Sequence, residues 1–499
     1  MPALPYDPVA DFELRELESL PWSSTLVLLR RLVAQDAAAA RRANYRTLLR
    51  ELAADVPEPF AELPDGASPF YFPVRTDRKS QLLSRLADSG IKALDVWSAT
   101  HPSVPGLPDS VAARRRATTV GLPVHQELGV AELERIVDAA AASPRTRPEL
   151  RLERVADVDS LAGEWDALAR RVGNIFATRE WISAWWRHHG RDKEWLVTAC
   201  RNLAGDLVAI LPLYVSSPRP VRMLRFLGHG AGDRLGPICA NADVVPVARA
   251  LSRLLIEART MWDVLLVEQI PADQRWGALL HGTHLRFEAS PSLRVHWDGF
   301  EGFLASRSRN FREQVRGRER RLRREHRLHF RLSDEPGRLQ ADLTTLFGLH
   351  ANRWGGGSQA FDGRRQAFHR DFAARALERG WLRLWFLELD DRPVSAWYGF
   401  RYAGAEWYYQ GGRDPAFERA AVGFVLLSHT VRAAIEDGVS EYKLLRGDEQ
   451  YKSRFANADD GLESFVVGRR LAGKAAAAGV AVAAALPPAA RRPLTGLIG

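Results

Sequence analysis

Six residues near the C-terminal end of the chain combine side chains that suit acid–base chemistry. The segment GDEQYK (residues 447–452) holds two carboxylates, a phenol and an ammonium group. Such groups accept and donate protons and stabilise developing negative charge. The alternative interpretation is a solvated loop that an ion pair between Glu449 and Lys452 holds together.

A turn of small residues lies upstream of this segment and begins an apolar helix pattern. Residues 420–423 (AAVG) form the turn, and the helix pattern runs over residues 423–437. The first backbone N–H groups of a helix have no acceptor inside it, and they lie at the positive end of its dipole. The turn is therefore suited to a phosphate, with Arg413 and Arg419 adding charge. The alternative is that Gly423 only starts a helix.

A third segment, HANRWGG (residues 350–356), ends a long helix pattern. His350 and Arg353 lie three positions apart, so both project from one face of the helix, with Trp354 beside them. A guanidinium group at this place suits an acidic or phosphorylated substrate. For His350 the alternative is a buried histidine at a helix end.

The elements that position these segments occur twice along the chain. Strand and helix patterns over residues 150–269 follow the order β-α-α-β-β-α-β, and residues 329–444 repeat this order with one extra strand. The strand that precedes the small-residue turn contains Tyr408 and Tyr409, which core packing alone would also explain. A repeated order without repeated residues predicts a tandem of related folds.

The segment from Asp390 to Phe455 resembles the acetyltransferase domain of CelD/BcsL-type proteins, a branch of the GNAT superfamily. A hairpin, a strand ending in YYQGG, a helix opening at AVGFVLL and the terminal GDEQYK occur in the family's order, and HANRWGG matches its H-x-x-R-W motif. The resemblance extends back to about residue 150. It implies an α/β (α+β) chain with tandem GNAT-like acyltransferase domains.

The resemblance implies that an acyl-CoA, such as acetyl-CoA, is the co-substrate. Its pyrophosphate would bind at the small-residue turn, and its pantetheine arm and thioester would lie beside the preceding strand. The expected donor-binding residues are Tyr409, Gln410, Gly411, Gly412, Arg413, Ala421, Val422 and Gly423.

The resemblance also gives the acid–base groups their roles. An attacking amine must be neutral, so a base has to take its proton. Glu449 is the first candidate for this base and Asp448 the second. Tyr451 would protonate the leaving thiolate, Lys452 would stabilise negative charge, and His350 is a further catalytic candidate.

Two residues of the HANRWGG segment would contact the acceptor. Arg353 and Trp354 are the expected substrate-binding residues, with Arg353 as the anchor for an acidic group. One position departs from the family pattern, because Lys443 stands where relatives carry an acidic residue. If that acid is essential, the chain is altered in substrate or inactive, although Glu441 would partly replace it.

A different resemblance covers residues 25–142. RRANYRTLL, SPFYFPVR, GIKALDVW and GLPVHQELGVAELERIV are similar to the small C-terminal domain of DegT/DnrJ-type sugar aminotransferases. Those enzymes hold pyridoxal phosphate on a lysine of a large domain that this sequence lacks. We therefore expect no pyridoxal phosphate here. The segment is either a docking or dimerisation module, with an aminotransferase as its partner, or the product of a misplaced gene start.

The arginine-dense stretch over residues 306–331 has ten arginines before Leu328 and few apolar residues. It lacks the interleaved aromatic residues on which nucleic-acid bases stack, so a solvated connecting helix is the expectation. The alternative is a contact with tRNA in a FemABX-like aminoacyl transferase, which uses the same tandem architecture. A third hypothesis is a non-catalytic partner or scaffold protein.

Composition narrows the class of protein. The chain has 499 residues and a net charge of +9, and only six of its 70 basic residues are lysine. Two cysteines, Cys200 and Cys239, provide no zinc cluster, and we expect no metal. No signal peptide or membrane-spanning segment is evident, so a cytoplasmic location is expected, with nucleic acid as a partner only under the tRNA alternative.

These patterns predict five segments and one activity. The segments are an aminotransferase-like unit (1–145), a first GNAT-like domain (149–300), an arginine-rich connecting helix (301–331), a second GNAT-like domain that binds acyl-CoA (332–467) and an Ala/Arg-rich tail (468–499). The tail has no strand or long apolar helix pattern, so we expect it to be mobile or bound to the surface. The expected activity is N-acyl transfer to an amine or hydroxyl group of a small-molecule or saccharide acceptor. Both resembled families are associated with surface carbohydrate, so a polysaccharide precursor is the expected substrate class.

Overall fold

A computed structural model describes residues 37–96, 98, 110–141, 150–216, 221–354, 358 and 360–485. The first residues of the segment that resembles the aminotransferase small domain, from residue 25, lie outside the described residues. The chain divides into two compact units, Met1–Arg147 and Pro148–Gly499. No helix in the described ranges has the length and apolarity that crossing a membrane requires.

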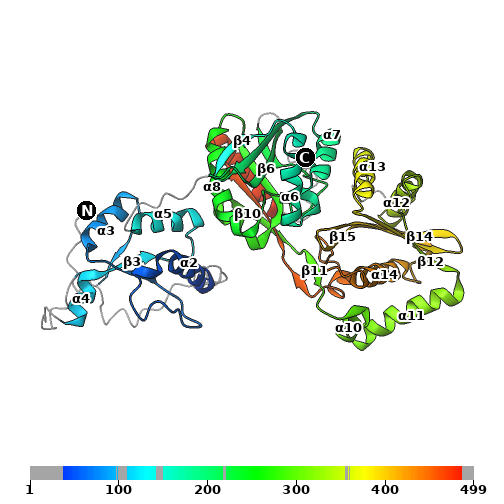
Figure 1. Ribbon diagram of the computed structural model, residues 1–499, viewed down its shortest axis with the longest axis horizontal. Coiled ribbons are helices and arrows are strands. Elements are labelled where there is room, and N and C mark those ends of the chain that lie inside the picture. Colours follow the sequence, from blue (N-terminus) through cyan, green and yellow to red (C-terminus); the bar gives the residue numbers. More distant parts are fainter. Residues whose placement is uncertain are drawn as a thin grey trace. The chain divides into compact units, whose positions relative to one another are not determined.

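The first unit is a small antiparallel sheet covered by helices (Figure 1). Its strand order is β1-β3-β2, and its core contains Phe72, Val120 and Leu122. The sequence patterns missed β3, whose residues TVGLP include glycine and proline, both rare inside strands. The elements are α2 Ala37–Leu52, β1 Tyr71–Arg75, α3 Lys79–Asp88, β2 Leu94–Asp95, α4 Val111–Thr118, β3 Thr119–Pro123 and α5 Val130–Ala140.

The second unit consists of two halves, each built on one large sheet. The sheet of the first half has the order β10-β18-β9-β7-β6-β5-β4, and β8 pairs with β6 outside this path. The elements of the first half are β4 Arg151–Arg154, α6 Ala162–Val172, α7 Arg179–His189, β5 Lys193–Arg201, β6 Leu207–Ser216, β7 Met223–Phe226, β8 Ile238–Cys239, α8 Val244–Glu257, β9 Val264–Pro271, α9 Trp276–Leu279 and β10 Thr283–Glu288.

The sheet of the second half has the order β12-β13-β14-β15-β16-β11-β17. The remaining elements of the unit are β11 Pro291–Arg294, α10 Gly299–Ala305, α11 Arg309–Glu325, β12 Leu328–Leu332, α12 Leu339–Trp354, α13 Gly363–Glu378, β13 Leu382–Leu389, β14 Arg392–Tyr402, β15 Ala405–Arg413, α14 Val422–Glu436, β16 Glu441–Lys443, α15 Gln450–Ser453, β17 Ala458–Asp459, β18 Leu462–Gly468 and α16 Arg470–Ala485.

The two halves exchange a strand. β11 follows the last strand of the first half in sequence, yet it pairs with β16 and β17 in the second sheet. In return β18, which follows the second half, inserts between β9 and β10 of the first sheet. Each sheet is therefore completed by chain from the other half, a feature that continuous domain boundaries drawn from the sequence do not describe.

Two tight hairpins order the strands around the second half's centre. The turns Asp390–Asp391 and Ala403–Gly404 each join paired residues, and all four have positive φ. Two-residue turns of this kind match the twist of the flanking strands. Figure 1 shows α12 and α13 on one side of this sheet and α14 on the other, with α10 and α11 beyond α14.

Aromatic side chains join the halves. Trp181 of α7 is fully buried, and its ring lies 4.8 Å from that of Phe368 and 4.7 Å from that of Phe372, both on α13. Phe176 lies 5.6 Å from Trp407 of β15. Edge-to-face pairs of this kind add to the gain from burial, so the halves pack as one body.

Two sequence predictions about the helices need correction. Residues 470–485 form α16, which packs on β18, where the sequence showed no strand or long apolar helix pattern. Its alanine-rich sequence hides the pattern, because small side chains give little contrast between the buried and exposed faces. The arginine-dense stretch forms α11 as expected, but Phe311, Val315 and Leu322 on one face are buried.

Phe465 of β18 tests the strand exchange. Its side chain is 0% exposed, and the strand is paired with both β9 and β10. Phe465→Ala should cost about 3–5 kcal/mol through the lost burial and the cavity. The loss should appear as faster hydrogen exchange in β9 and β10 of the first half.

Val482→Ala on α16 is the control, since this side chain is 64% exposed and should change stability by less than about 0.5 kcal/mol. Faster exchange confined to β13 and β14 in the Phe465 variant would contradict the exchange of strands.

Candidate active site

The central feature of the second half is a strand that loses one neighbour partway along its length. β15 and β16 run parallel and pair only at Ala405–Glu441, Glu406–Tyr442 and Trp407–Lys443. β15 then continues to Arg413 with only β14 beside it. The backbone N–H and C=O groups on this edge of residues 408–413 thus have no strand to pair with, and such groups require other partners.

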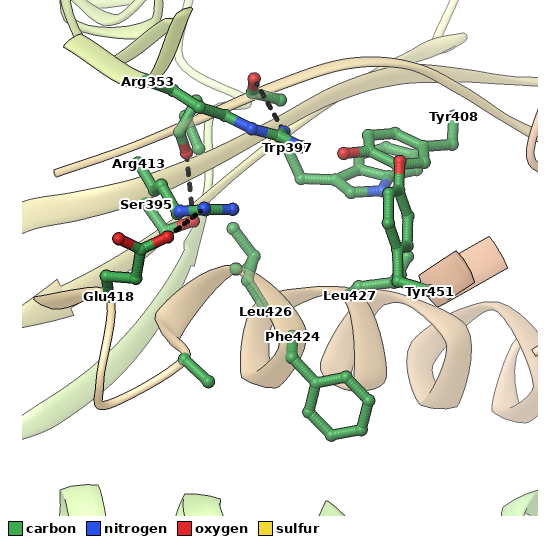
Figure 2. A pocket seen from close by; sticks show the side chains of 15 residues that line it. Arg353, Ser395, Trp397, Tyr408, Arg413, Glu418, Phe424, Leu426, Leu427 and Tyr451 are labelled. Atoms are coloured by element: carbon green, nitrogen blue, oxygen red, sulfur yellow. Dashed lines mark hydrogen bonds and ion pairs between the residues drawn. The ribbon is translucent and has the colours of Figure 1, made fainter. Parts of the chain in front are cut away.

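A pocket lies along this open edge (Figure 2). It encloses about 780 Å³ of empty space, including open solvent. Strands β14 and β15 form one wall, the first turns of α14 another, and α12 and α15 contribute one residue each. The lining residues are Arg353, Ser395, Ala396, Trp397, Tyr408, Gly411, Gly412, Arg413, Glu418, Ala421, Gly423, Phe424, Leu426, Leu427 and Tyr451.

The start of α14 lies at this pocket and has backbone amides without an intrahelical acceptor. Ala421, its N-cap residue, adopts the left-handed conformation with φ 53°. The N–H groups of Phe424 and Val425 both donate to the Ala421 carbonyl, so those of Val422 and Gly423 are the first without an intrahelical acceptor. An alanine in this conformation is strained, which is typical of functional sites.

Two arginines line the pocket. Arg413 of β15 forms an ion pair with Glu418 at 2.9 Å. Arg353 of α12 reaches the Gly411 carbonyl at 3.5 Å, and its guanidinium lies 4.5 Å from the ring centroid of Trp354. Figure 2 shows both guanidinium groups extending over the pocket.

An aromatic wall closes the other end of the pocket. The rings of Trp397 and Tyr408 stack 5.3 Å apart at 13°, and Tyr451 of α15 lies beside them (Figure 2). Burial raises the pKa of Tyr451 well above its usual value, and Tyr408 and Glu449 raise it further. Tyr451 is therefore a neutral phenol at every physiological pH.

The GDEQYK segment is held mainly by its lysine. Lys452 is 5% exposed, pairs with Glu449 at 2.9 Å and donates to the carbonyls of Leu445 and Arg446. A Cβ at Gly447 would lie 2.3 Å from Glu449 Oε2, and φ there is 118°, so only glycine fits. The ion pair that the sequence offered as an alternative is present, and Asp448 is exposed.

Both ring nitrogens of His350 are engaged. Nδ1 lies 3.2 Å from the Gly411 carbonyl oxygen, which can only accept, so Nδ1 carries the proton. Nε2 lies 2.8 Å from Ser358 Oγ and accepts from that hydroxyl. Burial lowers the pKa of His350, and Arg353 lowers it further despite the carbonyl contact. His350 therefore positions β15 and has no free nitrogen with which to act as a base.

Seven of the residues predicted for the site line the pocket: Arg353, Gly411, Gly412, Arg413, Ala421, Gly423 and Tyr451. Eight others do not: Tyr409, Gln410, Val422, His350, Trp354, Asp448, Glu449 and Lys452.

Tyr409 is outside the pocket because of a β-bulge. The register of β14 and β15 shifts between Tyr398 and Gly399, which leaves Tyr409 as an extra residue on β15. Its hydroxyl donates to the Ala231 carbonyl of the first half at 2.7 Å and lies 3.3 Å from His369 Nε2. Tyr409 thus joins the two halves, while its neighbour Tyr408 takes the place in the pocket.

Eight residues that line the pocket were not predicted as site residues. They are Ser395, Ala396, Trp397, Tyr408, Glu418, Phe424, Leu426 and Leu427. The alternation of side chains along β14 and β15 would place Trp397 and Tyr408 on one face, but only once the register of the two strands is known. The bulge makes that register unreadable from sequence.

Lys443, the departure from the family pattern, does not line the pocket. Its ammonium pairs with Glu441 at 2.5 Å and lies 5.3 Å from the Trp407 ring centroid. The charges of Lys443 and Glu441 offset each other, so Glu441 is not a free carboxylate.

The corresponding opening in the first half is bridged by side chains. β7 and β9 pair in parallel only at Met223–Val264 and Leu224–Leu265. Beyond them Arg225 lies 3.0 Å from His229 Nε2, which is 2.8 Å from Glu268 Oε2. This chain of contacts links the two diverging strands. Over the described part of the chain, no three His, Cys, Asp or Glu side chains group as metal ligands would.

Residues 309–453 match the family model of the acetyltransferase (GNAT) domain. This match covers the pocket, α11 and the GDEQYK segment. The chain therefore carries an acyltransferase domain of the GNAT type, and the tandem GNAT-like fold predicted from the sequence is confirmed. No curated protein matches the chain.

Solved structures with a similar arrangement cover about two thirds of the chain. The crystal structure of FemX is 11% identical and covers 64% of this chain and 97% of its own, with a TM-score of 0.47. The C-terminal DUF2156 domain of a putative lysylphosphatidylglycerol synthetase from Agrobacterium fabrum is 12% identical. It covers 65% of this chain and 97% of its own, with a TM-score of 0.44. A tandem GNAT protein from the clavulanic acid biosynthesis pathway is 13% identical. It covers 64% of this chain and 98% of its own, with a TM-score of 0.37. None of these likenesses identifies a substrate.

The contact between α12 and β15 is open to a direct test at Gly412. A Cβ there would lie 2.4 Å from the His350 backbone nitrogen and 2.5 Å from the Leu349 carbonyl carbon. Gly412→Ala must therefore push α12 away from β15 and should lower the free energy of unfolding by about 1–3 kcal/mol in urea titrations.

Gly423→Ala is the matched control, because a Cβ there would meet nothing closer than Arg413 Cδ at 3.7 Å. The midpoint of its urea unfolding curve should equal that of the wild-type chain or lie slightly above it. Equal unfolding curves for the two variants would show that α12 does not rest on β15.

Proposed function

Given the acetyltransferase (GNAT) domain over residues 309–453, we propose that this chain moves an acyl group from an acyl-CoA, bound in the second half, to an amine or hydroxyl acceptor. The observation that carries the proposal is the open edge of β15 beside the start of α14. The open edge of β15 would supply backbone groups to the extended pantetheine arm of the donor. The start of α14 would supply free amides to its pyrophosphate.

One orientation of the donor would use both features. Its pyrophosphate would accept from the N–H groups of Val422 and Gly423 at the positive end of α14, with Arg413 nearby. Its pantetheine arm would lie along residues 408–413 and pair with the backbone groups there that no side chain engages, whereas the Gly411 carbonyl already accepts from His350. The thioester would then reach the aromatic wall at Trp397 and Tyr408.

Acyl transfer would proceed by direct attack at this wall. The acceptor nitrogen or oxygen bonds to the thioester carbon, and the carbonyl oxygen becomes an oxyanion that backbone N–H groups of β15 stabilise. The C–S bond then breaks, and CoA leaves as a thiolate. A base takes the acceptor's proton, and Glu449 remains the first candidate and Asp448 the second, acting through water since neither lines the pocket.

The roles proposed for Tyr451 and Lys452 change in this account. A thiol has an ordinary pKa of about 8.5, so a phenol with a raised pKa is the weaker acid and would not give up its proton to the thiolate. Tyr451 would instead stabilise the thiolate by donating a hydrogen bond. Lys452 is engaged with Glu449 and two carbonyls, and it would position the segment without touching substrate.

The acceptor side of the pocket is marked by Arg353. Its guanidinium lines the pocket and stacks on Trp354, so it is held in place for an acidic or phosphorylated acceptor. A sugar or surface-polysaccharide precursor of the kind associated with the CelD/BcsL-type resemblance would meet this requirement.

Only the second half is proposed to hold a donor. Helix α8 of the first half starts after Asp243 and has Pro246 in its first turn. The carboxylate repels a phosphate, and the proline lacks an N–H group to donate. The bridge from Arg225 through His229 to Glu268 further occupies the opening of that half.

Two further predictions from the sequence stay open. The first unit has its own core and would dock an aminotransferase partner, as its resemblance to the DegT/DnrJ-type small domain implies. A cytoplasmic location would suit a protein that uses acyl-CoA.

The contacts of α11 give little support to the alternative in which the chain binds tRNA. Five of its arginines pair with glutamates, four of them within the same helix: Arg309–Glu313, Arg316–Glu301, Arg321–Glu325, Arg323–Glu319 and Arg324–Glu325. These pairs offset much of the charge that a phosphate backbone would require.

Calorimetric titration with acetyl-CoA tests the donor assignment. The wild-type chain should bind in the micromolar range, and Gly423→Glu should abolish binding, because it places a carboxylate against the pyrophosphate. Gly423→Gln is the matched control, since it has the same shape without the charge and a Cβ at this position has room. It should retain most of the affinity.

Equal losses in the Glu and Gln variants would mean that bulk, not charge, blocks the site. No binding of acetyl-CoA or longer acyl-CoAs by the wild-type chain would refute the donor assignment and favour aminoacyl-tRNA or a non-catalytic role.

A further inference from the structure

Two arginines share one phenylalanine at the start of α14. The guanidinium carbon of Arg318 and that of Arg454 each lie 5.1 Å from the ring centroid of Phe424. Phe424 directly follows Gly423 and lines the donor pocket. Figure 2 shows its ring projecting from α14 on the side away from Arg353 and Trp397.

The packing around Phe424 fixes both guanidinium groups. Arg454 also lies 5.2 Å from the Phe311 ring centroid, and its Nη2 donates to Gln314 Oε1 at 2.9 Å. Phe311 contacts Phe424 edge-to-face at 5.9 Å. Because each charge lies over an aromatic face, both are held without losing their capacity for hydrogen bonds.

Neither arginine has a carboxylate partner within the described part of the chain, although five other arginines of α11 do. The two charges lie within about 10 Å of each other, since both contact one ring. Burial lowers the pKa of Arg454, and the charge of Arg318 lowers it further, with no acidic group acting in the opposite direction. Two positive charges held this close together therefore have no counter-ion among the described residues.

We propose that Arg318 and Arg454 bind the 3′-phosphate of the CoA donor. This inference rests on the proposed acyl-CoA function. The proposed function already assigns the pyrophosphate to the amides of Val422 and Gly423 at the start of α14. CoA carries one more phosphate, a monoester with a charge of about −1.5 to −2, and Arg318 and Arg454 flank the same helix start from the other side. Arginine pairs with phosphate in a bidentate manner.

Acetyl-CoA and acetyl-3′-dephospho-CoA differ only in the 3′-phosphate. Comparing their affinities therefore tests the contact with this phosphate separately from the other contacts of the donor. Wild-type chain should bind acetyl-CoA at least about tenfold more tightly in calorimetry, the effect of one charge-assisted hydrogen bond. Arg318→Gln and Arg454→Gln should each remove most of that preference. Both variants should keep the wild-type affinity for the dephospho compound, which also shows that the donor pocket remains folded.

Arg320→Gln is the matched control. Arg320 is two positions from Arg318, about 200° around α11, and it is exposed. The substitution removes the same charge from the opposite face and should leave the preference for acetyl-CoA unchanged.

The outcomes separate this inference from the function on which it rests. Equal wild-type affinity for both compounds would overturn the inference and leave the donor assignment intact. Equal weakening of both compounds by Arg318→Gln and Arg454→Gln would overturn it as well, because it would indicate a general effect of charge. Failure of the wild-type chain to bind either compound would overturn the donor assignment and the inference together.

Discussion

The parting of β15 from β16 after Trp407 is the constraint on which the rest of the site depends. Up to that residue β15 is an ordinary inner strand, and beyond it one edge is free. Helix α12 holds this free segment through the close contact at Gly412 and the bond from His350 to the Gly411 carbonyl. The bulge at Tyr398 and Gly399 then turns Tyr408 into the pocket. Backbone groups fixed in this way need no reorganisation when a ligand arrives, which is the property that catalysis by hydrogen-bond donors requires.

The first half supports this arrangement without repeating it. Its aromatic contacts through Trp181 and Phe176 and the bond from Tyr409 to Ala231 hold the back of β15. The exchange of β11 and β18 makes each sheet depend on chain from the other half, so neither half is an independent unit. The first half retains the diverging strand pair, but Arg225, His229 and Glu268 bridge it. One half thus acts as a scaffold for the open site of the other.

Much of this fold was predictable from sequence because local patterns determine it. The small-residue turn before α14, the GDEQYK segment and the repeated element order all correspond to described features. The strand exchange was not predictable, since nothing in β11 or β18 specifies which sheet it joins. Tyr409 was predicted for the pocket and Tyr408 was not, because a one-residue bulge reverses the faces of the strand. His350 matched a motif, yet its two hydrogen bonds depend on Gly411 and Ser358, which lie on other segments.

Hydrogen exchange with and without acetyl-CoA tests the central claim most directly, because the claim concerns particular backbone amides. A donor bound along the open edge should slow exchange over residues 408–413 of β15 and at the first amides of α14. Residues 225–232 of the first half should be unaffected. Protection of residues 225–232 without protection of β15, or no protection anywhere at saturating acetyl-CoA, would contradict the account.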